Sequence, residues 1–231
     1  MIKKLLTERE HLKKTFLLAL IPAIIVISSS IFGVLDNFKN SFFDLNSRLF
    51  NPESPLQMKN HINKIIIVEI DQRSLDDVNR EGINWPWPRQ IYAPIIEYLS
   101  EAQAVFMDIL YTESSSYGKE DDEIFSRAIK DNNNVYLPVV LTKNFYKLTE
   151  KDDELLKRIS LPVGSIPGTI RDFKSVITPI DILKNSIVSS GNVTISPDND
   201  GVYRRIPFFF RLNNYHIPHF LLNYLLNFLL N

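Results

Sequence analysis

Residues 104–142 have the sequence AVFMDILYTESSSYGKEDDEIFSRAIKDNNNVYLPVVLT. The apolar runs at 104–111 and 134–142 have the length and composition of strands that are buried on both faces of a parallel sheet. Between them, DDEIFSRAIKD at 121–131 is typical of an amphipathic helix. A strand, a helix and a second strand in this order predict a parallel pair joined by a right-handed crossover. The stretch therefore predicts an α/β fold.

On the N-terminal side, KIIIVEID at 64–71 is a third apolar run that ends in an acid, and we expect it to be the first strand. A polar loop follows, and then a helical pattern over residues 90–101 that begins after Pro88, a residue suited to a first helical turn. We predict strands near 64–71, 104–110 and 134–141 that lie parallel in one sheet, with the two helices as crossovers.

On the C-terminal side, residues 143–175 are polar and irregular, which predicts a surface excursion with a short helix near 151–159. Residues 190–212 predict a hairpin whose turn passes through residues 198–201. The tail at 219–231 predicts either a helix on the sheet with an asparagine stripe outward or the approach to a further membrane segment. The expected fold is one α/β domain, residues 59–231, with a mixed, mainly parallel sheet flanked by helices and a C-terminal β-hairpin.

Residues 15–35 form an uncharged run of 21 residues, close to the ~20 that a helix needs to cross a bilayer. Five basic residues precede the run, so the positive-inside bias predicts a cytoplasmic basic tail over residues 1–14. An uncleaved transmembrane helix is favoured over a cleaved signal peptide, because the run is long for a signal core and lacks a clear cleavage site. Residues 36–58 then predict a juxtamembrane helix and linker, which either transmits a displacement or packs on its own domain.

Composition excludes several classes of function. The chain has no cysteine, and residues 36–231 carry a net charge of −4, whereas nucleic-acid binding needs a basic face. The sequence contains no nucleotide-binding glycine loop and no nucleophile elbow, so no catalytic residue and no cofactor are expected. His216 and His219 lack a third ligand group, and no metal site is expected.

Two aspartates mark the ends of predicted neighbouring strands. Asp71 and Asp108 would lie at the edge where open α/β sheets bind ligands, and could hold Mg²⁺ or accept a phosphoryl group. The structural alternative, which we favour, is that they cap loops or pair with Arg89. Because a cation at a helix start is disfavoured by the macrodipole, we predict that Arg89 forms a charge-assisted pair with at least one of them, which would fix the WPWPR loop.

Five further residues belong to the candidate ligand-binding or structural motif, and one of them, Asp122, is taken up with the motifs below. Trp85 and Trp87 either line a ligand pocket or pack a loop over the sheet edge, and packing is favoured. Asp200 belongs to a turn completed by Gly201. Arg204 and its neighbour are expected to alternate faces on a strand.

Three ordered motifs resemble the second class of the CHASE family of extracellular sensors. The first is WPWPR at 85–89, flanked by Ile-Asp at 70–71 and Met-Asp-Ile at 107–109. The second is Asp122 ahead of FSRAI, and the third is Gly191 followed by D-x-D-G-x-x-R-R-x-P at 198–207, which includes Asp200 and Arg204. The resemblance implies a domain outside the cytoplasm, normally followed by three further membrane helices and a cytoplasmic output domain.

The expected function is therefore the sensory part of a bacterial transmembrane receptor, in the inner membrane, with a single crossing in this chain and a periplasmic or extracellular domain. Expected partners are the bilayer through residues 15–35, a small-molecule or protein stimulus, and a second copy in a homodimer, with no nucleic acid. The alternatives are a metal-dependent phosphatase-like enzyme that uses Asp71 and Asp108, and a membrane-anchored structural or interaction protein.

Overall fold

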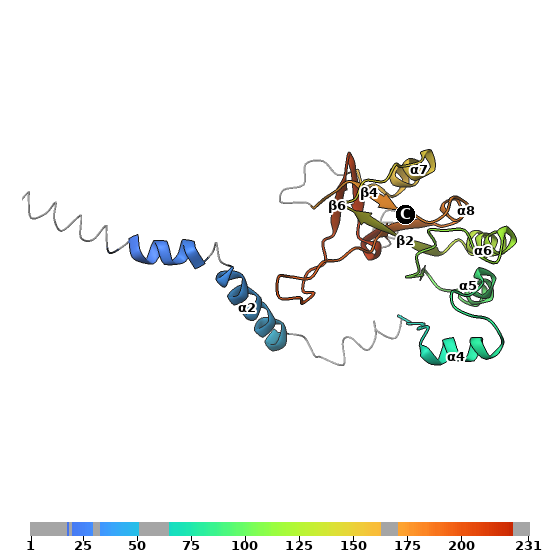
Figure 1. The fold of residues 1–231 in the computed structure, drawn as a ribbon, viewed down its shortest axis with the longest axis horizontal. Coiled ribbons are helices and arrows are strands. Elements are labelled where there is room, and N and C mark those ends of the chain that lie inside the picture. Colours follow the sequence, from blue (N-terminus) through green and yellow to red (C-terminus); the bar gives the residue numbers. More distant parts are fainter. Residues whose placement is uncertain (1–17, 19, 30–32, 51–64, 163–170, 224–231) are drawn as a thin grey trace, which may run out of the picture. The chain divides into compact units, whose positions relative to one another are not determined.

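The computed structural model describes residues 18, 20–29, 33–50, 65–162 and 171–223, and it divides the chain into two compact units, residues 1–69 and 70–231 (Figure 1). The helices are α2 (Val34–Phe50), α4 (Gln72–Arg80), the 3-10 turn η1 (Arg89–Ile91), α5 (Tyr92–Tyr98), α6 (Lys119–Asn132), α7 (Glu150–Ile159) and α8 (Asp181–Lys184). The strands are β1 (Val105–Phe106), β2 (Val135–Thr142), β3 (Asp172–Phe173), β4 (Ser175–Ile177), β5 (Ser189–Asn192), β6 (Phe209–Leu212) and β7 (Tyr215–Pro218).

In the first unit, residues 20–29 are helical and α2 forms a second helix. Within the described residues, no helix combines the length and the apolar character that a membrane crossing requires. Part of the predicted crossing at 15–35 and all of the predicted tail at 1–14 lie outside the described residues.

The second unit is built around β2, which is almost wholly buried, as its continuous apolar sequence predicts. It pairs in parallel with β1 and β5 and antiparallel with β4, so the predicted mixed sheet is confirmed. The crossover from β1 to β2 is α6, also as predicted. A second sheet has the order β3-β6-β7, and a single bridge between Asn192 and His219 joins the two.

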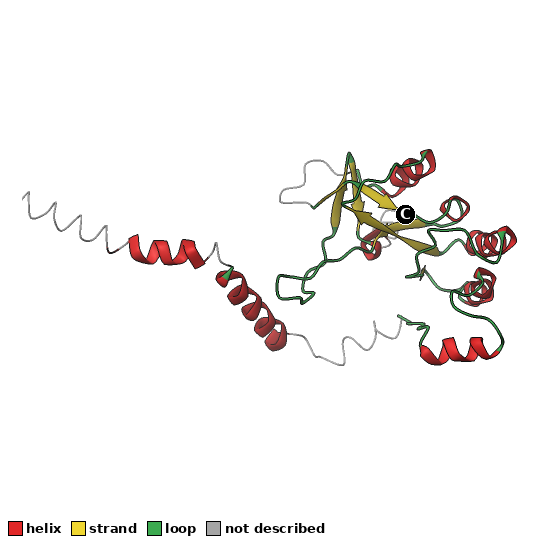
Figure 2. Cartoon of the chain, viewed as in Figure 1, coloured by secondary structure: helices red, strands yellow, loops and turns green. Residues whose placement is uncertain are grey.

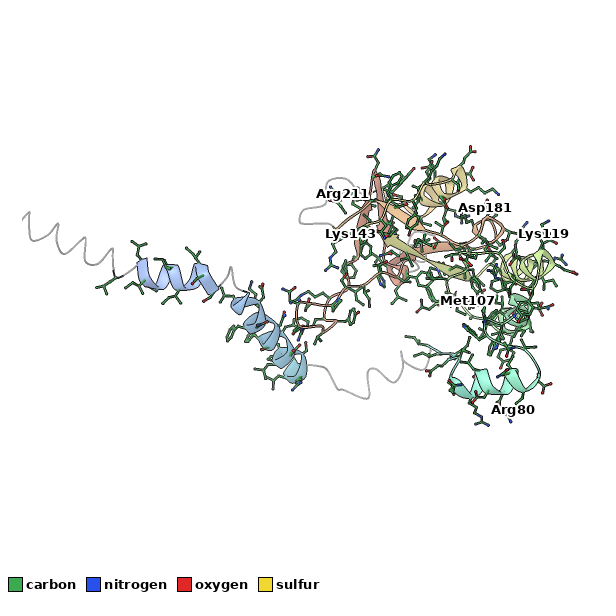
Figure 3. The ribbon with its side chains drawn as sticks, in the orientation of Figure 1. Arg80, Met107, Lys119, Lys143, Asp181 and Arg211 are labelled. Carbon is green, nitrogen blue, oxygen red and sulfur yellow. The ribbon has the colours of Figure 1, made fainter. Side chains whose placement is uncertain are left out.

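The helices α5, α6, α8 and α7 form a row in which each contacts the next, beside the larger sheet (Figures 1 and 2). Their inner faces supply the core, which includes the fully buried Phe125 and Ile129 of α6 and Leu156 of α7. Charged side chains such as Lys119 and Asp181 lie on the exposed sides of α6 and α8 (Figure 3).

The prediction of a first strand at residues 64–71 is wrong. Residues 65–70 form no strand, and Ile65, Ile66, Ile67 and Val68 are 64–86% exposed. An apolar run becomes a strand only when another strand accepts its backbone hydrogen bonds, and composition alone does not show whether one does. The following residues, expected to be a loop, instead form α4, because Asp71 caps the helix by accepting hydrogen bonds from the Ser74 backbone N–H at 2.8 Å and from its hydroxyl at 2.7 Å.

Two predictions on the C-terminal side also need correction. The helix at 151–159 exists as α7, but it buries Leu155, Leu156 and Ile159 in the core, so α7 is not part of a surface excursion, whereas residues 143–147 are exposed and irregular as predicted. The turn at 198–201 forms, with the Asp198 N–H donating to the Val202 carbonyl at 2.9 Å, yet the segments that flank it form no strands. The hairpin consists instead of β6 and β7, which pair antiparallel. Asn213, in the turn between them, adopts a left-handed φ of 53°.

The start of the C-terminal tail lies against the larger sheet. Asn223 is 3% exposed and its side-chain amide donates to the Ser189 hydroxyl at 2.8 Å and to the Ser190 carbonyl. The asparagine stripe therefore does not face outward at this position. Residues 224–231 lie outside the described residues.

Candidate functional site

The WPWPR loop leads directly into a helix. Pro88 is extended (φ −53°, ψ 136°) and precedes η1, which continues into α5. The fixed φ of proline suits this position, and no side chain of the loop itself caps the first turn. The backbone N–H groups at this helix start therefore need acceptors from elsewhere in the chain.

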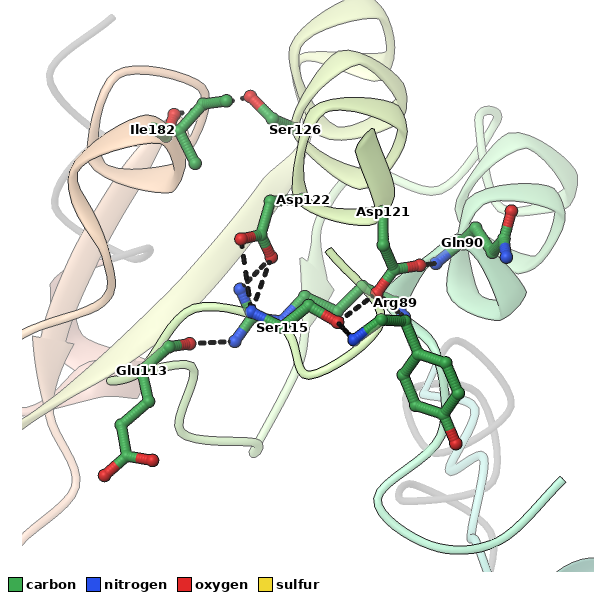
Figure 4. Close-up of polar contacts among 9 residues, drawn as sticks. Arg89, Gln90, Glu113, Ser115, Asp121, Asp122, Ser126 and Ile182 are labelled. Carbon is green, nitrogen blue, oxygen red and sulfur yellow. Dashed lines mark hydrogen bonds and ion pairs between the residues drawn. The ribbon is translucent and has the colours of Figure 1, made fainter. Parts of the chain in front are cut away.

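Asp121, more than 30 residues away in the sequence, supplies those acceptors (Figure 4). One carboxylate oxygen accepts the Arg89 backbone N–H at 2.7 Å, and the other accepts the Gln90 N–H at 2.8 Å. The Ser115 hydroxyl donates to the same carboxylate. Since Asp121 is 3% exposed, it acts as a buried anionic cap that complements the helix dipole.

The Arg89 side chain points to the neighbouring acid, Asp122. Its guanidinium donates to the Asp122 carboxylate and to the Glu113 carbonyl, and its Cζ lies 5.1 Å from the centre of the Tyr111 ring. The Ser115 backbone N–H donates to both Asp122 oxygens, at 3.3 and 3.2 Å. The two side chains are 9% and 5% exposed, so this is a buried, charge-assisted pair.

The local sequence explains why α6 provides both acids. Its first turn carries Glu120, Asp121 and Asp122, and negative charges are stabilised at a helix N-terminus. Gly118 precedes the helix with φ 100°, a conformation that a residue with a Cβ rarely adopts. The starts of α5 and α6 thus lie close together, joined by two carboxylates and the loop at 113–115. We call these five residues, Arg89, Glu113, Ser115, Asp121 and Asp122, the clamp.

Aromatic rings form a continuous cluster beside the clamp. Trp85 meets Trp87 edge-on at 5.5 Å, Trp87 and Tyr92 are 6.2 Å apart, and Tyr92 lies 6.2 Å from Tyr111, which contacts Phe125 at 4.9 Å. Burial raises the pKa of Tyr92 to about 12. Burial, with a smaller contribution from Tyr92, also raises the pKa of Tyr111, and nearby Arg89 opposes that shift.

The two tryptophans differ in their surroundings. Trp87 is 8% exposed and packs in the core, whereas Trp85 is 51% exposed at the surface of the cluster. The Trp87 indole nitrogen and the Tyr111 hydroxyl are buried and have no hydrogen-bond partner among the described residues. Buried polar groups normally have partners. Among the described residues Asn132 Nδ2 and Asn134 Oδ1 also lack one, but only the Trp87 and Tyr111 atoms belong to the aromatic cluster.

The predicted partners of Arg89 are wrong. Asp71 caps α4, and Asp108 is exposed and makes no hydrogen bond or ion pair that involves Arg89. Because residues 65–70 form no strand beside β1, the two acids do not end neighbouring strands, and a shared Mg²⁺ or phosphoryl site has no support. Among the described residues, no group of three or more acidic, histidine or cysteine side chains is arranged to hold a metal ion.

Asp200 and Arg204 pair with each other across a turn. Arg204 pairs with Asp200 at 2.8 Å and with Asp198 at 3.3 Å, and Arg205 pairs with Asp198 at 2.6 Å. Gly201 has φ 81°, as the turn sequence predicts. The two arginines do not lie on a strand, but they differ in burial as expected: the Arg204 side chain is 7% exposed and faces carboxylates, whereas that of Arg205 is 54% exposed.

Sequence reasoning missed a second buried ion pair. Lys184 Nζ lies 2.6 Å from Asp152, with the two side chains 6% and 11% exposed. Asp152 also accepts from Thr178 at 2.6 Å and completes a capping box with Thr149 at the start of α7. The T-x-x-D pattern at 149–152 signals the cap, but no local pattern signals a buried lysine.

Comparison with known proteins gives one match. The model of the CHASE2 domain matches residues 17–231, nearly the whole chain, and the chain therefore belongs to this family of extracellular sensory domains. Neither the search of curated proteins nor that of solved structures found a match. The resemblance carried by WPWPR, Asp122 and the Asp200 turn is confirmed.

Proposed function

We propose, starting from the chain's membership of the CHASE2 family, that it is the signal-input part of a bacterial transmembrane receptor. Residues 15–35 anchor it in the inner membrane, and the domain at 59–231 faces the periplasm or the exterior. The domain binds a stimulus and relays it across the membrane to an output domain. The charge imbalance around residues 15–35 supports this orientation.

One observation in the structure carries the sensing proposal. The buried Trp87 N–H and Tyr111 hydroxyl have no partner among the described residues, and they belong to an aromatic cluster whose outer ring, Trp85, is 51% exposed. Small-molecule sites are usually lined by hydrophobic and aromatic side chains, with a few polar groups that orient the ligand. The site favours a small molecule with a flat apolar face and an oxygen acceptor.

The clamp connects this cluster to the rest of the domain. The Arg89 guanidinium lies over the Tyr111 ring, and its Nη1 atom pairs with the carboxylate of Asp122 in α6. A ligand that displaced Tyr111 would therefore alter the packing of α5 against α6, two helices that are in direct contact. This gives a contiguous route from the ligand to the helices of the domain.

Tryptophan fluorescence tests the site directly, because the only two tryptophans of the chain both lie in the cluster. The full chain would be titrated with a panel of small aromatic and carboxylated molecules, with melting temperature as a second readout. A ligand of the proposed site raises the melting temperature and changes the emission. Trp87→Phe, which keeps an aromatic ring, although a smaller one, but removes the N–H, should weaken binding roughly fivefold to tenfold.

A matched control is Phe145→Tyr, at a position that is 80% exposed and outside the cluster, which should leave binding unchanged. A ligand that raises the melting temperature without changing tryptophan emission, and that binds Trp87→Phe with full affinity, binds elsewhere. That result would overturn the proposed site.

Reporter fusions test the topology separately. A fusion placed after Asn60 should be active only in a reporter that requires export, and a fusion before residue 15 only in a cytoplasmic one. Export-independent activity after Asn60 would exclude the receptor proposal. If a cytoplasmic output domain follows in the gene, an odd number of further crossings must precede it, so zero or two crossings would contradict the relay.

A further inference from the structure

The helix α2 carries an apolar stripe with the spacing of a coiled coil. Leu35, Phe38, Phe42, Leu45 and Leu49 recur at alternating intervals of three and four residues. This average of 3.5 residues corresponds to the seam positions of a heptad repeat. The stripe is narrower than the face by which a helix usually packs on a globular core.

Within its own unit, this stripe is exposed. Phe38 is 71% exposed, Phe42 57%, Leu45 52% and Leu49 66%. On the opposite side of the helix, Asn40 is 8% exposed and is the one buried position among the described side chains of α2. We propose that the stripe is a self-association surface, and that α2 of a second copy of this chain packs against it as a parallel two-stranded coiled coil.

The charges of α2 favour a second copy over a lipid surface. The helix carries two acids, Asp36 and Asp44, and two bases, Lys39 and Arg48, so it has no net charge. An interfacial helix gains affinity from a polar face rich in lysine and arginine, which α2 lacks. In a parallel, in-register pair, Ser41 beside the seam faces Asn46 of the other helix, and no like charges meet there.

The size of the surface indicates where the pair is stable. With ~100–150 Å² buried for each of the four exposed seam side chains, the two copies together bury on the order of 1,000 Å², at the lower limit for a specific interface. Two and a half heptads are also few for a coiled coil in dilute solution. Anchoring in one membrane raises the effective concentration and fixes the parallel orientation. The inference rests on the proposed anchor for the effective concentration and for the parallel orientation.

Cysteine crosslinking tests the surface without interference, since the chain has no cysteine of its own. Single cysteines would replace Phe38, Phe42, Leu45 and Leu49 in the full chain in membranes, and mild oxidation would be followed by non-reducing gels. The matched controls, Asn37→Cys, Asp44→Cys and Ser47→Cys, lie on the same helix off the stripe. We expect a disulfide-linked dimer fraction at least fivefold higher at the stripe than at the controls.

A second variant tests whether the two helices pack through the apolar stripe or are only close together in the membrane. Phe42→Asp should lower crosslinking through Leu49→Cys severalfold, whereas Asn37→Asp should not change it. Equal crosslinking at all seven positions, or a maximum off the stripe, would overturn the proposal. So would stripe cysteines that form no dimer and are shielded from a membrane-impermeant maleimide, the result expected for a helix in the lipid headgroups. The fusions after Asn60 report on the anchor independently.

Discussion

Replacing Arg89 by alanine should destabilise the domain by an amount that identifies the clamp as a buried ion pair. The substitution removes the guanidinium that pairs with Asp122, donates to the Glu113 carbonyl and lies over the Tyr111 ring. Asp122, 5% exposed, would keep only the long hydrogen bonds from the Ser115 N–H. Breaking a buried pair from one side costs roughly 3–5 kcal/mol, because the remaining charge is uncompensated.

Urea unfolding of the full chain, followed by far-UV circular dichroism, measures this loss. With an m-value of about 2 kcal/mol per M, a loss of about 4 kcal/mol lowers the midpoint by about 2 M. Arg80→Ala is the matched control, because its partner is Asp77 and the two side chains are 73% and 49% exposed (Figure 3). An exposed pair contributes about 0–1 kcal/mol, so this variant should unfold close to the unmodified chain.

Substituting the partner, Asp122, as well shows whether the loss of stability comes from the ion pair itself. In Arg89→Ala combined with Asp122→Asn, the uncompensated charge is gone, and the double variant should be more stable than the sum of the single losses predicts by about 1–3 kcal/mol. If Arg89→Ala does not fold, Arg89→Lys, which keeps the charge but loses the fork of donors, gives a smaller and measurable loss. A cost below about 1 kcal/mol for Arg89→Ala, equal to that of Arg80→Ala, would refute the clamp.

Three other changes follow from the structure. Gly191→Ala should cost roughly 1–3 kcal/mol in a denaturation series, because the added Cβ would lie 2.6 Å from the backbone Cα of Phe220; an unchanged midpoint would show that this approach is not close. Burial alone would raise the pKa of Asp152, but hydrogen bonds, led by that from Lys184, hold the pKa at about 2, below the ordinary 3.8. The stabilisation of the folded state by the Asp152 carboxylate is therefore present above pH 3.8 and is lost as the pH falls toward 2. Unfolding measured between pH 5 and 2 should therefore lose about 2 kcal/mol more in the unmodified chain than in Asp152→Asn, and equal slopes would contradict this assignment. Asp71→Ala should cost about 1 kcal/mol, the loss of a helix cap, and a loss near that of Arg89→Ala would restore Asp71 as a partner of the arginine.

Much of the local structure was predictable because its cause is local. The strand β2 is a continuous apolar run, α6 follows from helical periodicity with an acidic first turn, and residues 198–201 follow from turn chemistry. The motif residues of the candidate site were also identified, since Trp85, Trp87, Arg89 and Asp122 do lie together. The sequence did not indicate that Asp121 caps the helix that Arg89 begins.

Which segments and side chains meet was decided by tertiary structure alone. Helical hydrogen bonds join residues four apart, so the sequence by itself determined α6 and α7, together with the motifs that identify the family. A strand and an ion pair need partners from distant segments. The apolar residues at 65–68 consequently remained exposed, and Arg89 paired with Asp122 rather than with Asp71 or Asp108. Lys184 became buried because packing placed Asp152 within 2.6 Å, which compensates the charge that burial would otherwise disfavour.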